Sequence, residues 1–127
     1  MSFDWSKFVV LGEELPSQYK GGAGMEAALR SAVSRMYYGF FHQIRQRLLQ
    51  DVPSPQFANS KDIHQDVTQH LKTVRKSREC RQLAEQLGRL RSYRNSADYD
   101  DRIDNPGQWH SFAVGSADRI KKAIDNL

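Results

Sequence analysis

The stretch LRSAVSRMYYGFFHQIRQRL, residues 29–48, decides the fold of this chain. Its large apolar side chains recur at alternating spacings of three and four residues, which places them on one face of an α-helix. The pattern predicts a long amphipathic helix that buries this face and ends before Pro53 and Pro55. The apolar face is formed by Leu29, Val33, Met36, Tyr37, Phe40, Phe41, Ile44 and Leu48.

A short helix is predicted before this stretch, because apolar residues share a helical face there and turn-forming residues bound it. Asp4 is placed to cap its start, Pro16 to close it, and the glycines within 21–24 to form the loop that follows. The apolar face is formed by Trp5, Phe8, Val9, Gly12 and Leu15.

Three more helices are predicted after Pro55. Ser60 or Asp62 is placed to cap the first of them, and Asn105 followed by Pro106 is typical of a helix start. The inward faces are Ile63, Val67, Leu71 and Val74, then Cys80, Leu83, Leu87, Leu90, Arg94 and Ala97, then Trp109, Phe112, Ala113, Ile120, Ile124 and Leu127. Because no alternating strand pattern of useful length appears, the sequence predicts an all-α, up-and-down bundle of four to five helices, a single domain over 1–127.

Length and composition agree with one soluble domain. The chain has 127 residues, 19 lysines and arginines against 15 acidic residues, and a formal charge of +4, a balance that permits a nucleic-acid partner. The single cysteine, Cys80, excludes an intrachain disulfide. With no leader or membrane-length apolar run, we expect a cytoplasmic protein without membrane contacts. The four histidines lack the spacing of metal ligands, so no metal or cofactor is expected.

Arg94 is the unusual residue, because it occupies a core position on an apolar helical face. A guanidinium keeps its charge on burial and therefore needs a carboxylate, a wet crevice or a partner subunit. Asp98, one turn later, is placed for an intrahelical ion pair. Alternatively, Arg94 meets Arg35 or His42 of the helix over residues 29–48 in a crevice that a dimer axis would double and that would suit a phosphate.

A second candidate feature is formed by Arg35, Tyr38 and His42, which share a sector of the long helix away from its apolar face. Such a patch is either a solvated surface or a contact surface for RNA, a nucleotide or a partner protein. The basic run from Arg75 to Arg81 is interpreted as a solvated connector that would attract polyanions if it lay near the same crevice.

Residues 30–42 (RSAVSRMYYGFFH) and 90–100 (LRSYRNSADYD) together resemble small bacterial HEPN-domain proteins. The early tryptophan and the last helix extend the resemblance over nearly the whole chain. The resemblance implies a four-to-five-helix bundle that commonly forms a homodimer, with an active crevice between the second and fourth helices. It further implies a toxin–antitoxin or other defence setting, either as a metal-independent endoribonuclease or beside a minimal nucleotidyltransferase.

The family's motif, an Arg-x(4–6)-His pattern with a polar residue after the arginine, is present only in part. Arg94 and Asn95 match its first two positions, whereas Tyr99, Asp100 and Asp101 stand where the histidine is expected. An unperturbed tyrosine titrates at about 10 and is a weak acid–base group at neutral pH. Cleavage is therefore left open, and His42 is a candidate to stand in for the missing histidine.

The resulting hypothesis is a domain that binds RNA or a nucleotide in a crevice centred on Arg94. The candidate catalytic residues are Arg94, Asn95 and Tyr99, and the candidate binding residues are Arg35, Tyr38, His42 and Asp98. The alternative is a non-catalytic helical partner of a nucleotidyltransferase, an antitoxin or another protein, with Tyr99 as the acceptor of a modification.

Overall fold

The chain folds into α-helices joined by short connections. The computed structural model describes residues 3–51 and 62–127. The helices are α1 (Ser6–Gln18), α2 (Met25–Leu48), α3 (Ile63–His70), α4 (Arg78–Tyr99) and α5 (Pro106–Ile124), with a 3-10 turn at Leu49–Asp51 and a π-helical turn at Leu71–Arg75. Because no strand occurs in the two described ranges, the prediction of an all-α bundle is confirmed.

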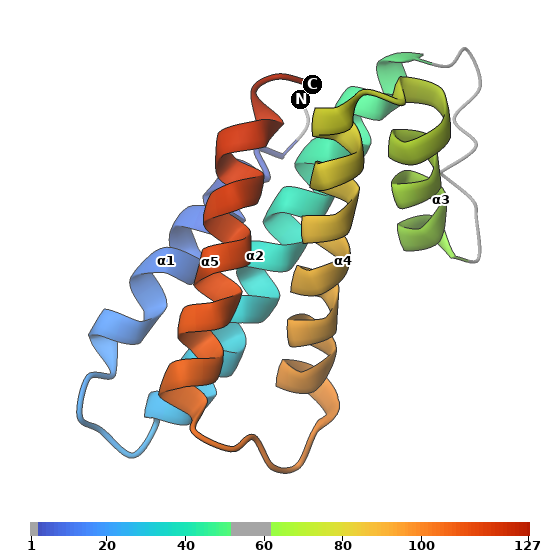
Figure 1. Ribbon diagram of the computed structural model, residues 1–127. Coiled ribbons are helices and arrows are strands. Elements are labelled where there is room, and N and C mark those ends of the chain that lie inside the picture. Colours follow the sequence, from blue (N-terminus) through green and yellow to red (C-terminus); the bar gives the residue numbers. More distant parts are fainter. Residues whose placement is uncertain (1–2, 52–61) are drawn as a thin grey trace.

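α2 is the central helix of the bundle (Figure 1). α1, α4 and α5 each pack along it, and α1, α2, α4 and α5 alternate in direction. α3 lies outside this group, next to α4 (Figure 1). It therefore adds a wall beside the seam between α2 and α4.

The core follows the apolar faces predicted for α2 and α4. Every apolar position predicted within residues 29–48 is buried. The predicted inward face of α4 is buried as well, and this includes Arg94, whose residue exposure is 7%. Within the described residues, no helix is long and apolar enough to cross a membrane.

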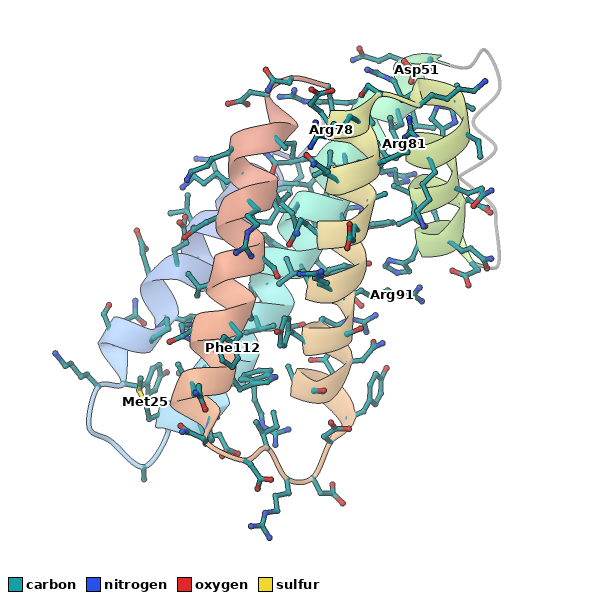
Figure 2. All side chains as sticks on the ribbon, in the orientation of Figure 1. Met25, Asp51, Arg78, Arg81, Arg91 and Phe112 are labelled. Carbon is teal, nitrogen blue, oxygen red and sulfur yellow. The ribbon has the colours of Figure 1, made fainter. Side chains whose placement is uncertain are left out.

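Two residues predicted to face inward are exposed instead. Val74 is 57% exposed because it lies in the π-helical turn, where the wider spacing of the hydrogen bonds rotates it off the face that Val67 and Leu71 bury. Phe112 is 56% exposed and lies on the outer surface of α5 (Figure 2), because the inward stripe of that helix passes through the neighbouring Ala113. Both predictions were wrong.

The predicted helix boundaries are mostly observed. Asp62 accepts a hydrogen bond from the Gln65 backbone at 3.0 Å and caps α3, and Asn105 caps α5 with Pro106 in its first turn. Asp4 was predicted to cap α1, but the N-cap is Trp5, and Asp4, one residue earlier, accepts from the backbone N–H of Ser6 at 3.0 Å. Pro16 was predicted to close α1 but lies inside it, because a proline this close to the end of a helix removes only one hydrogen bond. Pro53, Pro55 and Ser60 lie outside the described residues.

α1 approaches α2 closely at two glycines. A Cβ on Gly12 would lie 2.8 Å from the Ala32 carbonyl oxygen, and a Cβ on Gly39 would lie 2.6 Å from Val9 Cγ2. Only glycine therefore permits this spacing. Near this close crossing, Trp5 and His42 stack on each other, and their ring centroids are 3.9 Å apart.

Candidate functional site

Arg94 lies over two adjacent tyrosine rings in the seam of α2 and α4. Its guanidinium carbon is 5.3 Å from the ring centroid of Tyr37 and 5.3 Å from that of Tyr38. Its Nη1 lies 3.6 Å from Asp98 Oδ2, and its side chain is 8% exposed. The expected ion pair with Asp98 is thus present, and two aromatic faces that the sequence pattern did not indicate add cation–π attraction.

The Nε of Arg94 is buried inside the seam. Among the described residues, nothing accepts a hydrogen bond from its buried Nε. A buried unpaired donor is costly, and this donor belongs to the residue that the family motif marks. The chain therefore satisfies the charge of Arg94 but not its full hydrogen-bonding capacity.

Tyr37, on α2, contacts both Arg94 of α4 and His64 of α3. The ring is fully buried and its hydroxyl forms a short hydrogen bond with His64 Nδ1. Burial raises the pKa of Tyr37 well above its usual range, so the phenol stays neutral. Burial and then the charges of Arg91 and Arg94 lower the pKa of His64 to about 4. Both partners of the hydrogen bond are therefore uncharged at neutral pH.

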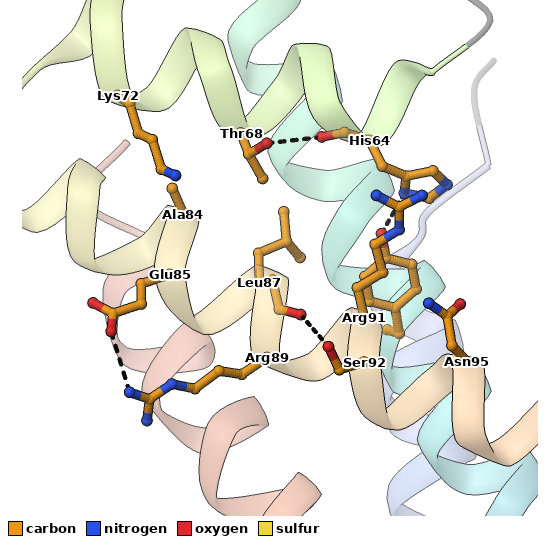
Figure 3. Close-up of a pocket in the computed structure, with 12 residues that line it drawn as sticks. His64, Thr68, Lys72, Ala84, Glu85, Leu87, Arg89, Arg91, Ser92 and Asn95 are labelled. Atoms are coloured by element: carbon orange, nitrogen blue, oxygen red, sulfur yellow. Dashed lines mark hydrogen bonds and ion pairs between the residues drawn. The ribbon is translucent and has the colours of Figure 1, made fainter.

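A cavity of about 530 Å³ opens between α3 and α4, with Tyr37 at its base. Lys72 from the π-helical turn after α3 and Arg91 from α4 point into it, and Arg91 reaches toward His64 (Figure 3). Arg89, also on its lining, is held by Glu85 at 3.1 Å. The cavity is therefore polar and cationic.

Arg91 is only weakly paired within the chain. Its side chain is 38% exposed, it projects from α4 on the side of α3 (Figure 2), and its nearest carboxylate oxygen, on Asp62, is 3.9 Å away. Its Nε is buried without a hydrogen-bond partner among the described residues. A phosphate in the cavity would offer a planar guanidinium the bidentate contact that Asp62 does not give.

The predicted motif residues divide between the seam and the surface. Asn95 is exposed and lines the cavity. Asp98 holds Arg94 and also accepts from the Ser34 hydroxyl at 3.4 Å. Tyr99 is 75% exposed at the end of α4 and is not part of the cavity lining. The structure thus brings Arg94 and Asp98 together and leaves Tyr99 apart from them.

The predicted patch on α2 also divides. Tyr38 is half-buried against Arg94. Arg35 is exposed with its guanidinium 5.4 Å from the ring centroid of Phe8, and His42 stacks on Trp5, so both are directed toward α1. Burial, followed by the charge of Arg45, lowers the pKa of His42. Arg35 and His42 therefore do not line the cavity.

Sequence reasoning missed His64, Arg91 and Lys72, which give the cavity its chemistry. No motif or spacing relates them, because α3 and α4 are separate helices whose relative rotation is not set by the periodicity of either. The available signal was the basic character of residues 89–91 on a helix already marked by Arg94. No group of three or more histidine, cysteine, aspartate or glutamate residues in the described ranges is arranged to hold a metal ion.

Comparison with known proteins gives no relative of this chain. No family model matches it, and neither a curated protein nor a solved structure does. What the site does must therefore be inferred from its own residues and their geometry.

Proposed function

We propose that this chain is a HEPN-type domain that binds RNA or a nucleotide by its phosphates, in the α3–α4 cavity and the Arg94 seam beside it. The observation that carries the proposal is the charge of the cavity. Lys72, Arg89 and Arg91 line it, and Glu85 is the single acidic residue among the described residues of its lining. Because Glu85 already pairs with Arg89, the charges of Lys72 and Arg91 are placed to meet a phosphate.

In this proposal Arg94 does not line the cavity but affects it through Tyr37 and Asn95, which do. Its charge lies against Tyr37, which forms the base of the cavity, and it precedes Asn95, which lines it. The guanidinium therefore positions the base and adds positive potential to the site. Asn95 offers an amide to a ribose hydroxyl or a base edge, groups that RNA-binding proteins commonly contact.

The binding test uses a short single-stranded RNA and measures affinity by fluorescence anisotropy over a range of salt. Arg91→Met and Lys72→Met should each weaken binding and each reduce the slope of log affinity against log salt by about one, as the loss of one phosphate contact requires. Arg102→Met is the matched control, since Arg102 is 89% exposed in the connection between α4 and α5. Equal losses in all three variants would mean that only overall charge matters and would contradict the proposed site.

Cleavage is proposed to be weak, although Arg94, Asn95 and Tyr99 occupy the motif positions. Phosphate pairing survives without the histidine, whereas proton transfer at neutral pH does not. The unaltered protein should bind RNA and leave it intact, and Tyr99→His should raise cleavage above that level. Efficient cleavage by the unaltered chain that is lost in Arg94→Ala would establish an endoribonuclease that uses other acid–base groups.

We also propose a homodimer, in a toxin–antitoxin or defence setting, in which the second copy packs near Arg94 on α2 and α4. The resemblance to HEPN-domain proteins, which commonly form homodimers, supports this. A mass measurement in solution should return two chains per particle. A strict monomer at all working concentrations would contradict the proposed dimer.

The second candidate function is that of a non-catalytic partner of a nucleotidyltransferase, and the exposure of Tyr99 favours it. A hydroxyl on a ring that is 75% exposed at a helix end is accessible to a modifying enzyme. Incubation with ATP and a minimal nucleotidyltransferase should add a nucleotide to Tyr99, detected by mass spectrometry and abolished in Tyr99→Phe. Modification of Tyr19, which is 45% exposed, in place of Tyr99 would contradict a specific acceptor.

A further inference from the structure

His64 lies where a ligand in the α3–α4 cavity would meet it. The residue is in the first turn of α3 and belongs to the lining of the cavity. Its ring packs on Phe41 with centroids 4.2 Å apart, and its Nδ1 is engaged by the Tyr37 hydroxyl. The ring is therefore fixed in position, with Nε2 as the nitrogen left for a ligand.

Groups from three helices determine the charge of this ring. α2 contributes the neutral hydroxyl of Tyr37 and the imidazole of His42, α4 contributes Arg91 and Arg94, and the start of α3 contributes the carboxylate of Asp62. Two fixed positive charges thus face the ring against one negative charge. Partial burial is the largest cause that holds the free ring neutral at neutral pH, and the two positive charges add to it, in agreement with its pKa of about 4.

A phosphate in the cavity would reverse this balance. Its negative charge would lie among the same two guanidinium groups, offset their repulsion of a proton on His64, and give Nε2 an acceptor. We propose that His64 is a direct ligand of an RNA phosphodiester in this cavity: when the strand binds, Nε2 takes up a proton from solvent and donates it to a phosphate oxygen, while Nδ1–H donates to the Tyr37 hydroxyl. This inference rests on the proposed function, because it requires that RNA occupies the cavity.

Proton uptake fixes the pH dependence of binding. A group whose pKa is higher in the complex than in the free protein makes affinity rise as pH falls through the range between the two values. For one proton the rise is at most tenfold per pH unit. Affinity for RNA should therefore increase as pH falls from about neutral and level off near the pKa of the free ring, about 4.

The test uses a short oligouridylate without terminal phosphates, because neither uracil nor an internal phosphodiester titrates in this range. Calorimetric titrations at mildly acidic pH in two buffers that differ in ionisation enthalpy measure the protons taken up. In parallel, the imidazole NMR signals of the unaltered protein are titrated with and without the RNA. We expect net proton uptake and an upward shift in the titration midpoint of the His64 signal.

His64→Asn keeps a polar group near Tyr37 and cannot be protonated, so it should bind RNA with less proton uptake and a flatter pH dependence. His110→Asn is the matched control, because His110 is another half-buried histidine with a pKa lowered by burial, on α5 and outside this cavity. Binding without proton uptake, or the same uptake in His64→Asn, would overturn the inference and leave the proposed function standing. Absence of RNA binding at every pH would overturn both. The NMR titration of the unaltered protein decides the matter even if His64→Asn does not fold.

Discussion

Arg94 and Arg91 lie one helical turn apart on α4 and have opposite surroundings. Arg94 is buried against the adjacent rings of Tyr37 and Tyr38, with Asp98 beside it. Arg91 is 38% exposed in the cavity, and its nearest carboxylate oxygen is 3.9 Å away. The arginine that interrupts the apolar pattern is thus largely satisfied by the chain itself, whereas its unremarkable neighbour is the one available to a ligand.

Removal of the two side chains should separate their roles most clearly. Arg94→Ala leaves a void beside two tyrosine rings and should destabilise the fold by about 2–4 kcal/mol. Arg91→Ala, at a partly exposed site, should cost about 0.5 kcal/mol or less. Urea unfolding at neutral pH measures both. Arg94→Met is the matched variant and should cost about 1 kcal/mol or less, because it fills the space and places a sulfur on the aromatic faces.

Equal costs for Arg94→Ala and Arg91→Ala would contradict the buried, packed position of Arg94. A large cost for Arg94→Met as well would mean that the positive charge itself, and not the volume, holds the seam together.

The pH dependence of stability tests the electrostatic effect of both arginines on His64. The folded-state pKa of His64 is about 4, against 6.5 for an unperturbed histidine, so the unfolded chain binds its proton more readily. The stability that depends on a neutral His64 is therefore complete above about 6.5 and is lost as pH falls toward about 4. Discounted for partial exposure, the loss is on the order of 1–2 kcal/mol.

Urea unfolding of the free protein at several pH values measures this loss of stability. His64→Asn should remove the part of the acid-induced loss that comes from protonation of His64. If Arg91 contributes as described, Arg91→Met should raise the pKa of His64 and reduce the loss too. An identical pH profile in the parent and His64→Asn would show that other groups cause the acid sensitivity.

Replacement of Arg91 should weaken RNA binding more than replacement of Arg94 does. This is the reverse of the order expected for their effects on the free energy of unfolding. Arg91→Met removes the proposed phosphate contact and should weaken binding about tenfold, or about 1.4 kcal/mol. Arg94→Met removes only potential transmitted past Tyr37 and should weaken binding roughly threefold. Anisotropy titrations of both folded variants give the ratio. A greater loss in Arg94→Met would mean that the seam of α2 and α4 opens to receive the RNA.

The same contrast explains which features the sequence could predict. The buried faces of α2 and α4, Arg94 included, follow from the spacing of side chains along one helix, and the capping of α5 by Asn105 follows from local chemistry. These are local properties, so the periodicity contains them. The π-helical turn that exposes Val74 changes the period itself and has no signature in the apolar pattern.

The site depends on how helices are rotated against one another. Arg94 contacts the rings of both Tyr37 and Tyr38. Tyr37 was predicted in the core and Tyr38 on the surface patch of α2. Arg94 reaches both because its side chain lies where the buried and the exposed faces of α2 meet. His64 meets Tyr37 because α3 packs against both α2 and α4. The periodicity of a helix shows which face it buries but not which residues of the next helix it meets.

The smallest expected effect on stability is that of replacing Asp98, the ion-pair partner that the sequence predicted for Arg94. If Asp98 were the sole support of a buried charge, its removal would cost about 3–5 kcal/mol. In the fold, however, the contact is 3.6 Å long, the Asp98 side chain is 33% exposed, and two aromatic faces share the guanidinium. Asp98→Ala should therefore destabilise by about 1 kcal/mol or less, as for an exposed pair.

Asp98→Asn is the control for Asp98→Ala, since it keeps a group for the Ser34 hydroxyl and removes the charge. Urea unfolding at low and high salt measures both variants, and the small loss should shrink further as salt screens the pair. A loss of about 3 kcal/mol or more in both variants would show that the tyrosine rings contribute little and that Asp98 carries the charge of Arg94 alone. The difference between the two arginines would then be one of ion pairing, with the aromatic faces only filling space.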